Sequence, residues 1–497
     1  MAAGTMSDAE RVQSVRRRAH AQVAVDGSDA LLGEQRFFDE FTKDRPSLAE
    51  RLEAGRTLRK SVPRSAHSAY APDPQRPDPV AVLIEQNKTR IQALVPIRNA
   101  RMLVSPFSFL RGAAAIMARD LWHTPSTGLL VAACGDMHVS NFGLFGSAER
   151  NLVFAINDFD EVHPGPWEWD LKRLAASIAL VATSLGGNRR DAETSVRRAV
   201  EIYRQRIARY AQMAYLETWY DCIDERSVLA VLPPALRRGA EENMDKARAK
   251  GRLQSLDRLT EEVGGEHRII EDIPLIVREE HLESGVPLKE ALEVMLRTYV
   301  ASLPEDRRRL FSRYRIVDAA RKTVGVGSVG TGCWVILLQG LDSEDPLFLQ
   351  AKQATQSVLA PFTPTPLHFK NQGQRVVVGQ RLTQGSPDIF LGWGNVDGTD
   401  FYVRQLADMK GGVKFTDGDR SALAGLPEYC GLCGWALALA HAKSGDPAMI
   451  AGYCGKSSAL DEAIAKFAMA YMEQTELDHA ALVEAARKGR ISVSQPE

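Results

Sequence analysis

The chain has 497 residues, of which 44% are hydrophobic, enough to bury ordinary globular cores in about two to four domains. Its 62 Lys and Arg residues nearly balance 63 Asp and Glu residues, so no strong net field favours nucleic acid or an anionic membrane as a partner. No run approaches the roughly 18 apolar residues of a membrane span, and the charged N-terminus lacks a signal peptide's apolar segment, so we expect a cytoplasmic protein.

The N-terminal part predicts little compact structure. Residues 1–54 are rich in charge and alanine, with one short helix expected at residues 37–41, and we interpret them as a poorly ordered extension. Prolines recur through residues 61–79, which excludes a regular helix and suggests a strap that lies over a surface. We expect compact structure to begin after this strap.

Two short apolar runs, residues 129–134 and 151–156, read as buried strands. Each is followed directly by a cluster of polar residues. Because binding and catalytic residues often lie on loops that leave a rigid scaffold, we expect a site where these two strands end.

The rest of the chain changes from helical to β-rich and back. Helical periodicity covers residues 169–220, and residues 235–312 are charged and helical as well. The sequence pattern changes at Tyr314. Beyond it, glycine-rich and strand-like segments predict a small antiparallel sheet. The strands expected there are residues 333–338, 347–352, 376–378 and 401–403. Residues 427–486 again predict helix.

We therefore predict an α+β fold with a helix-rich large lobe and a small antiparallel β lobe. Four segments are expected along the chain. They are the extension 1–54, a helical lobe 55–313 that carries both polar clusters, the strap and a helical insertion, a β-rich lobe 314–426, and a C-terminal helical segment 427–497 that packs on the large lobe.

The six cysteines of this long chain do not suggest a disulfide framework. Cys430 and Cys433 form a CxxC motif, and a structural zinc site would need two further ligands, such as Cys454 and His441. The interpretation that we favour places these cysteines on the buried face of a helix.

The two polar clusters match the needs of phosphoryl transfer. That reaction requires a carboxylate to orient the attacking hydroxyl, an amide and a second carboxylate to hold Mg²⁺, and cations or backbone amides to bind phosphates. The motif GDMHVSN puts Asp136 five residues before Asn141, the spacing of the kinase catalytic loop. Asp158 follows Asp136 by 22 residues (158 minus 136) in an Asp-Phe-Asp sequence at a strand end. A kinase carries its metal-binding aspartate in such a place.

These motifs resemble the signature of the aminoglycoside and choline kinase branch of the protein-kinase-like superfamily, G-D-x-H-x-x-N followed by a strand ending in I-D-F/W. That branch continues with an Asp that opens a helix, which Asp170 matches. The resemblance implies a two-lobe kinase-like fold that uses ATP and Mg²⁺. It also implies that Asp136 is the catalytic base and that Asn141 and Asp158 bind magnesium. Asp160 is grouped with the metal ligands, and Asp170 is implied to brace the catalytic loop.

A longer likeness extends from the Ser-Pro-Phe segment at residues 105–107 to the Trp-Asp-Leu-Lys-Arg-Leu segment at residues 169–174. The run is similar to the bacterial family catalogued as domain of unknown function 2252, and the likeness covers the chain from about residue 55 to about residue 489. It names relatives without naming a reaction, so function still depends on the site.

A glycine-rich segment opens the β-rich lobe. Gly325, Gly327 and Gly330 form a GxGxxG pattern around Ser328, and Lys352 follows on a later strand. The pattern resembles a phosphate loop whose backbone amides, with the lysine, bind nucleotide phosphates, but a turn within a sheet also favours glycine. Dinucleotide binding is disfavoured because a strand-like run follows the glycines where that fingerprint needs a helix.

The order of these parts is reversed relative to kinases, in which the glycine loop and lysine precede the catalytic loop. We therefore expect a circularly permuted or rearranged kinase-like fold, with the β-rich lobe packed over the helical lobe so that Lys352 meets Asp158. No Asp or Glu occurs between Lys352 and Asp388, so the usual acidic partner of the lysine must come from another segment or be absent.

Three further residues are placed around the site. His138 is interpreted as structural, hydrogen-bonding inside the catalytic loop, in preference to a metal ligand. Arg111 either contacts phosphate or forms a buried ion pair. Arg404 either lines the cleft or lies at a solvated strand exit.

The sequence thus predicts an ATP- and Mg²⁺-dependent phosphotransferase acting on a small-molecule or protein hydroxyl, with nucleotidyl transfer from the same site as a variant. One alternative is a metallophosphoesterase that uses a two-metal cluster, although such sites usually recruit several histidines. That cluster would contain Asp136, His138, Asp158 and Asp160. Another alternative is a catalytically inactive kinase-like module that binds nucleotide. These motifs specify neither the acceptor nor the oligomeric state.

Overall fold

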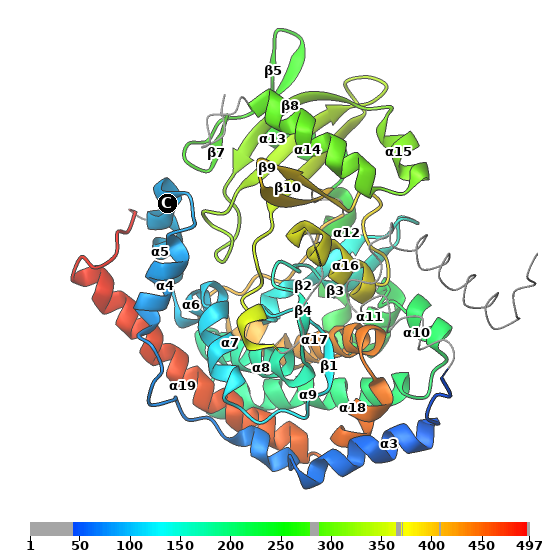
Figure 1. Ribbon diagram of the computed structural model, residues 1–497, viewed down its shortest axis with the longest axis vertical. Coiled ribbons are helices and arrows are strands. Elements are labelled where there is room, and N and C mark those ends of the chain that lie inside the picture. The colour runs from blue at the N-terminus through cyan, green and yellow to red at the C-terminus, as the bar shows by residue number, and fades with distance from the viewer. Residues whose placement is uncertain (1–42, 279–287, 364–368, 370, 407–408, 495–497) are drawn as a thin grey trace, which may run out of the picture.

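The computed structural model describes residues 43–494 except 279–287, 364–368, 370 and 407–408. It is a mixed α+β structure in which an antiparallel sheet with covering helices lies above a larger helical body (Figure 1). We call residues 252–405 the sheet unit and the remaining described chain the helical body. The helix expected at residues 37–41 lies outside the described residues.

The helical body contains two short antiparallel strand pairs, β1 with β4 and β2 with β3, among its helices. Its helices are α3 (Leu48–Thr57), α4 (Pro79–Asn87), α5 (Val95–Leu103), α6 (Pro106–Gly112), α7 (Ala114–Trp122), α8 (Trp167–Ser184), α9 (Arg189–Tyr210), α10 (Tyr215–Tyr220), α11 (Glu225–Val231), α12 (Pro234–Ala249), α17 (Arg420–Ser444), α18 (Pro447–Cys454) and α19 (Ala459–Arg487). Its strands are β1 (Leu130–Ala133), β2 (Phe142–Gly146), β3 (Leu152–Ile156) and β4 (His163–Pro166). The two strands expected before the polar clusters are therefore present as β1 and β3.

Three long helices, α8, α9 and α17, form the centre of this body. Nearly every residue of α8 is buried, including charged ones. Helices α9 and α17 cross closely because α17 carries small residues: a Cβ on Gly434 would overlap the carbonyl oxygen of Ala199. Cys430 and Cys433 are free and buried on α17, as the preferred interpretation of the CxxC motif expected.

Helix α17 is also the one described helix that is long and apolar enough to cross a membrane. Most of its apolar stretch is buried inside the helical body. A helix that is apolar all round and enclosed by other helices is the usual core helix of a soluble globular protein.

Helix α3 shows that ordered structure begins earlier than the sequence suggested. Ser47 and Glu50 form a capping box at its start, and Arg51 pairs with Asp446, which caps helix α18. Gly55 lets α3 approach α18 so closely that a Cβ would overlap the carbonyl oxygen of Met449. The expected extension 1–54 was wrong at its C-terminal end, because the capping signal lies in a short, charged segment with little apolar periodicity.

The proline-rich residues 61–79 run over α19 as a strap. They contain a short 3₁₀ helix, Arg64–Ser68, whose His67 is fully buried. His67 Nε2 lies 2.7 Å from the hydroxyl of Tyr453 on α18, so the strap is joined to the C-terminal helices.

The sheet unit is built on a six-stranded sheet with the order β11-β12-β10-β9-β8-β7, in which every neighbouring pair is antiparallel. Its elements are α13 (Arg252–Leu259), β5 (Thr260–Val263), β6 (Glu266–Ile269), β7 (Ile276–Val277), α14 (Leu288–Ser302), α15 (Glu305–Phe311), β8 (Arg315–Lys322), β9 (Cys333–Gln339), β10 (Pro346–Gln353), α16 (Gln372–Thr383), β11 (Gly392–Val396) and β12 (Thr399–Gln405). Helix α14 buries Met295 and Tyr299 against one face of this sheet.

Two expectations about this region were wrong. The valine run at residues 376–378 lies in helix α16, not in a strand, because Asn371 caps the helix and Val376 and Val377 are buried by packing that outweighs their local β preference. The boundary at residue 314 is also displaced, since α13, α14 and strands β5–β7 already belong with the sheet. The sequences of α13 and α14 predict amphipathic helices but do not indicate whether these helices pack on the sheet or on the helical body.

Candidate functional site

The loop that follows β1 is fixed by a buried carboxylate. Asp170, at the start of α8, accepts backbone hydrogen bonds from Cys134 N at 2.6 Å and from Gly135 N at 3.0 Å. Gly135 has a φ of +72°, and a Cβ there would lie 2.9 Å from the Cβ of Glu161. Asp170 therefore holds the backbone where β1 ends and the loop begins.

Asp136 is held by an arginine that sequence analysis did not single out. Buried Arg173 donates from Nε to Asp136 Oδ1 at 3.0 Å and donates to the same oxygen from Nη2. Nη2 also donates to the carbonyl oxygen of Leu110 at 2.9 Å. Asp136 Oδ2 faces the glycine loop, since a Cβ on Gly327 would lie 3.8 Å from it. The spacing of three between Asp170 and Arg173, which puts both on one helix face, was the available signal.

His138 is a buried side chain whose contribution is packing. Its ring lies edge-on to Phe107, with 6.1 Å between ring centroids, and its Nε2 is 3.9 Å from Asp136 Oδ2. Burial lowers the pKa of His138 to about 4 despite the opposing effect of Asp136, so the ring is neutral at neutral pH. Its Nδ1 has no hydrogen-bond partner within the described structure, so the expected side-chain hydrogen bond inside the loop is not made there.

Asn141 and Asp158 come together at the ends of the two motifs. Asn141 Nδ2 donates to the carbonyl oxygens of Asp136 at 3.0 Å and of Asp158 at 3.4 Å, which leaves the amide oxygen as its remaining ligand atom. The Asp158 side chain is 37% exposed and therefore accessible from the cavity. One carboxylate and one amide oxygen fit the partial protein coordination that Mg²⁺ accepts when substrate phosphates and water complete its shell.

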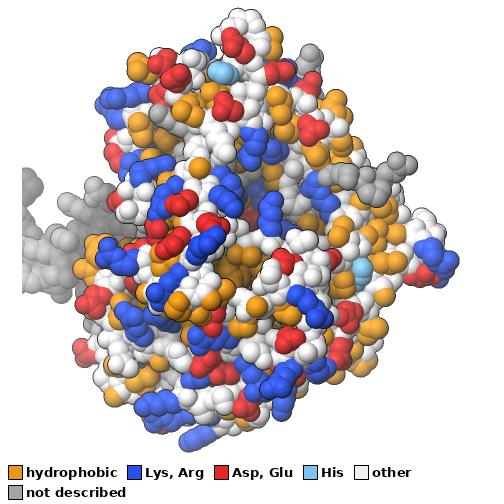
Figure 2. Space-filling view, turned by 180° about the vertical axis from the view of Figure 1, so that it is seen from behind, with side chains coloured by type: hydrophobic (Ala, Val, Ile, Leu, Met, Phe, Trp, Pro, Cys, Tyr) orange, Lys and Arg blue, Asp and Glu red, His pale blue; other side chains and the backbone are white. Residues whose placement is uncertain are grey.

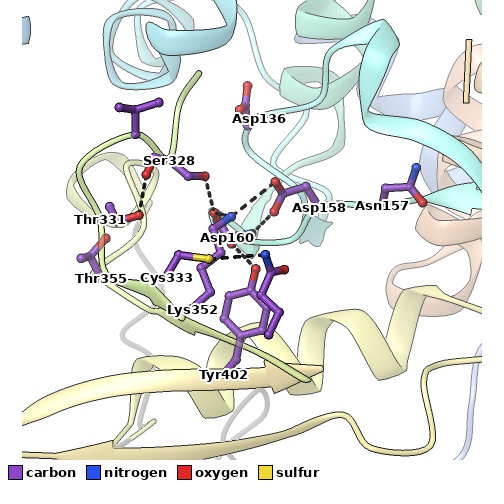
Figure 3. A network of polar contacts seen from close by, with 12 residues as sticks. Asp136, Asn157, Asp158, Asp160, Ser328, Thr331, Cys333, Lys352, Thr355 and Tyr402 are labelled. Atoms are coloured by element: carbon purple, nitrogen blue, oxygen red, sulfur yellow. Dashed lines mark hydrogen bonds and ion pairs between the residues drawn. The ribbon is translucent and has the colours of Figure 1, made fainter. Parts of the chain in front are cut away.

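Lys352 of β10 lies against the same carboxylates (Figure 3). Its Nζ is 3.6 Å from Asp158 Oδ2 and forms a closer ion pair with Asp160 Oδ2, although 192 residues separate Lys352 from Asp160. Asp160 also accepts from Tyr402 OH at 2.7 Å and from Ser328 Oγ at 3.2 Å. The acidic partner that the sequence around Lys352 lacks is thus supplied by the second motif.

These contacts separate the roles of the two aspartates. Both oxygens of Asp160 are engaged by side chains, so the structure gives it the contacts of a counter-ion to Lys352 where the sequence suggested a metal ligand. Burial raises the pKa of Asp158, but Lys352 and Arg404 lower it by more, so this carboxylate stays ionised well below its usual range. Burial lowers the pKa of Lys352, whereas Asp158 and Asp160 raise it above its ordinary value.

Arg375 of α16 fixes the backbone of the second motif. This buried side chain donates to the carbonyl oxygens of Asp160 and Thr355 at 2.8 Å each, and also to that of Val162. Sequence analysis missed Arg375 because it directly precedes residues 376–378, which were read as a strand, and no helix was expected there.

The glycine loop between β8 and β9 docks on the helical body. Gly325 and Gly330 have φ values of +69° and +86°, which residues with a Cβ rarely adopt. Ile91 N donates to Gly330 O at 2.8 Å, and Val329 is fully buried in a cluster with residues around α5. The loop is therefore held to the helical body by the contact of Ser328 with Asp160 and by these contacts around α5.

The two remaining predicted arginines line different cavities. Arg404 of β12 donates to Gln350 Oε1 at 3.1 Å and to the carbonyl oxygen of Asn157 at 3.0 Å, beside Asp158. Arg111, at the end of α6, lines the cavity that contains Asp136 and forms no ion pair with a described residue. Neither arginine lies at a solvated exit or in a buried ion pair.

A cavity of about 140 Å³ joins the motifs. Nine of the predicted residues line it, namely Arg111, Asp136, His138, Asn141, Asp158, Asp160, Gly325, Gly327 and Ser328. From behind, the molecule is hollowed between the sheet unit and the helical body, and lysine and arginine side chains gather around the hollow (Figure 2). Among the described residues, no group of three or more His, Cys, Asp and Glu side chains is placed to hold a metal ion.

A family model described as an uncharacterized protein conserved in bacteria (DUF2252) matches residues 90–485. The chain belongs to this family. The matched range contains both polar motifs, the glycine loop and Lys352, and every residue that lines the cavity except Gln86. No curated protein and no solved structure matches the chain.

Proposed function

We propose that the protein is an ATP- and Mg²⁺-dependent phosphotransferase that acts on the hydroxyl of a small molecule or a protein. The observation that carries this proposal is the 3.6 Å distance between Lys352 Nζ and Asp158 Oδ2, with Asp136, Asn141 and the glycine loop around one cavity. A lysine for phosphates, oxygen ligands for a metal and a free carboxylate for the acceptor are the parts that phosphoryl transfer needs.

Each part has a role that follows from its contacts. Asp136 Oδ2 is the free atom that would orient an acceptor hydroxyl, because Arg173 holds Oδ1. Asn141 and Asp158 would hold Mg²⁺, which supplies charge neutralisation at the transferred phosphate. Lys352 would exchange part of its ion pair with Asp160 for phosphate oxygens when nucleotide enters the cavity.

The order of elements supports a permuted kinase-like two-lobe fold. The sheet unit carries the glycine loop between β8 and β9 and the lysine on β10, and the helical body carries the catalytic loop and Asp158. Kinases use the same succession of loop, strand and lysine before the catalytic loop. The two-metal hydrolase alternative has weaker support, since Asp160 is occupied by Lys352 and Tyr402 and His138 is enclosed in packing.

The decisive experiment is a thermal-shift titration with ATP alone, Mg²⁺ alone and both together. Stabilisation that requires the pair supports a kinase site, because a ligand stabilises the folded state in proportion to its selective binding. Hydrolysis of ATP in the same samples reports transfer of the phosphoryl group to water. No stabilisation by the pair would reject the proposal, whereas stabilisation without turnover on any hydroxyl acceptor would favour the inactive binding module.

A further inference from the structure

Each carboxylate of the site cavity has a nearby donor. Asp136 has Arg173, and Asp158 and Asp160 share Lys352. Glu161 accepts from the backbone of Val358 N at 2.7 Å, and burial raises its pKa to about 7, so much of its charge is lost near neutral pH.

Two arginines in the same cavity wall have no such partner. Arg90 donates to the carbonyl oxygen of Val329, and Arg111 lies 5.9 Å from the ring of Phe107, but neither forms an ion pair with a described residue. The buried Nε of Arg111 has no hydrogen-bond partner within the described structure. Burial lowers the pKa of both guanidinium groups, and nearby carboxylates oppose this only in part: Glu161 and Asp160 at Arg90, and Asp136 and Asp158 at Arg111. Because arginine stays charged in proteins, two partly desolvated cations remain without a direct ion pair among the described residues.

Both arginines belong to the helical body and border the glycine loop. A Cβ on Gly330 would lie 3.0 Å from Arg90 Cβ, and a Cβ on Gly327 would lie 3.1 Å from the carbonyl oxygen of Arg111. The same point at Gly327 is 3.8 Å from Asp136 Oδ2, so the backbone of Arg111 and the carboxylate oxygen that faces the cavity both border Gly327. Lys352 approaches instead from the sheet unit.

We infer that Arg90 and Arg111 form an anion subsite that binds a phosphate or carboxylate group of the acceptor. The acceptor assignment rests on the proposed phosphotransferase function, in which Lys352, the loop amides and the metal already serve the nucleotide phosphates. Guanidinium groups bind such oxyanions through two parallel hydrogen bonds. The attraction between the two charges is strongest where water is excluded. The acceptor is therefore an anionic hydroxyl compound, with its hydroxyl at Asp136 and its anion at the arginines.

The test is thermal-shift titration of the full chain with sodium phosphate, matched by sodium chloride at equal ionic strength, with and without saturating Mg-ATP. Phosphate should raise the parent's melting temperature in both conditions. Arg111→Gln and Arg90→Gln should each weaken phosphate binding by about 10- to 100-fold, the usual loss for a hydrogen bond to a charged group. The matched control is Arg238→Gln, whose side chain is 90% exposed on α12 and should leave the phosphate response unchanged.

The variants separate the sources of the anion. If Arg111→Gln keeps Mg-ATP affinity while phosphate affinity falls, the anion belongs to the acceptor as inferred. If both affinities fall together, the arginines serve the nucleotide and the acceptor assignment is wrong, although phosphotransfer stands. If the parent binds phosphate through these arginines but never binds Mg-ATP, the proposed function fails and the anion subsite remains.

A parent without a phosphate response, or Gln variants that retain it, would overturn the subsite. Arg111→Lys, which keeps the charge, is the control for misfolding.

Discussion

At the scale of single residues, the contact between Arg173 and Asp136 decides which atom is free for chemistry. Arg173 binds Oδ1 with two nitrogens, and Oδ2 points toward the glycine loop. A carboxylate held by one oxygen has a defined direction for the other, which is the preorganisation that a base needs. Asp158 lacks such an arginine clamp on the cavity side and remains open to a cation.

The two aspartates should therefore respond differently to the same substitution. Asp136→Asn keeps an oxygen acceptor for Arg173 and removes only the proton-accepting charge, so Mg-ATP binding should stay within a few-fold of the parent. Transfer should fall by the roughly 10² to 10⁴-fold typical of losing a general base. Binding by calorimetry and turnover by product formation measure the two effects. Loss of Mg²⁺ as severe as in Asp158→Asn would make Asp136 a ligand and move the metallophosphoesterase ahead.

Asp158→Asn should abolish Mg²⁺-dependent nucleotide binding while the protein still folds, since Lys352 retains Asp160 as its counter-ion. Circular dichroism checks the fold, and titration of ATP with and without Mg²⁺ checks the binding. Asp245→Asn, at a side chain that is 76% exposed, is the matched control. A variant at residue 158 that binds Mg-ATP like the parent would show that the metal assignment is wrong.

At the scale of elements, sequence reasoning succeeded where motif residues adjoin a strand end. Strands β1 and β3 precede Asp136 and Asp158 as expected, because short apolar runs followed by polar clusters are a local signal. It failed for Arg375, whose helix α16 was read as a strand because three successive valines have a β preference. The partner of Lys352 could not be predicted either, since the sequence of one segment does not indicate which distant segment it will contact.

The strap, residues 61–79, predicts a specific acid sensitivity. Burial lowers the pKa of His67 to about 3, below the ordinary value of 6.5, so between these values the unfolded chain binds a proton that the folded chain refuses. The stabilisation is complete above pH 6.5 and is lost as the pH falls through this window, by about 2 kcal/mol at pH 5. His67→Gln, which keeps a hydrogen-bonding group near Tyr453, should show a shallower loss in acid denaturation profiles.

His123→Gln is the control for this prediction, because its parent side chain is 43% exposed and its contacts with Asp73 and Trp122 lie at the surface. Its stability should follow the parent at every pH. Equal acid profiles for the parent and His67→Gln would mean that the buried histidine does not set the sensitivity.

At the scale of the whole molecule, the glycine loop is a joint between the sheet unit and the helical body. Val326 packs with residues of α4, α5 and α6, and Val329 packs with Leu94 and Ile97. Domain boundaries predicted from composition and periodicity alone missed this arrangement. An apolar residue in a glycine-rich loop does not indicate whether it will pack against the sheet unit or the helical body. The site cavity is lined by residues of both units, so its shape depends on this joint.

Val329→Ala should loosen the joint. Loss of two buried methyl groups costs about 1–3 kcal/mol, here at a contact between units, so local opening should increase more than global unfolding. Limited trypsin digestion should cut faster after Lys322, at the end of β8, and Mg-ATP affinity should fall. Val294→Ala, at a side chain that is 49% exposed, should change neither. Equal digestion rates in both variants would show that Val329 does not hold the loop.

Lys352 lies 192 positions after Asp160 in the chain, so the ribosome synthesises the aspartate well before the lysine. A ribosome adds roughly 5–20 residues per second, so the carboxylates emerge some 10 to 40 seconds before the lysine that neutralises them. During that interval the nascent helical body presents two adjacent aspartates without their cation, and the C-terminal helices α17 to α19 that complete its core are not yet made. Under the proposed function, nascent chains should therefore stay inert toward nucleotide until β10 and helices α17 to α19 have been synthesised.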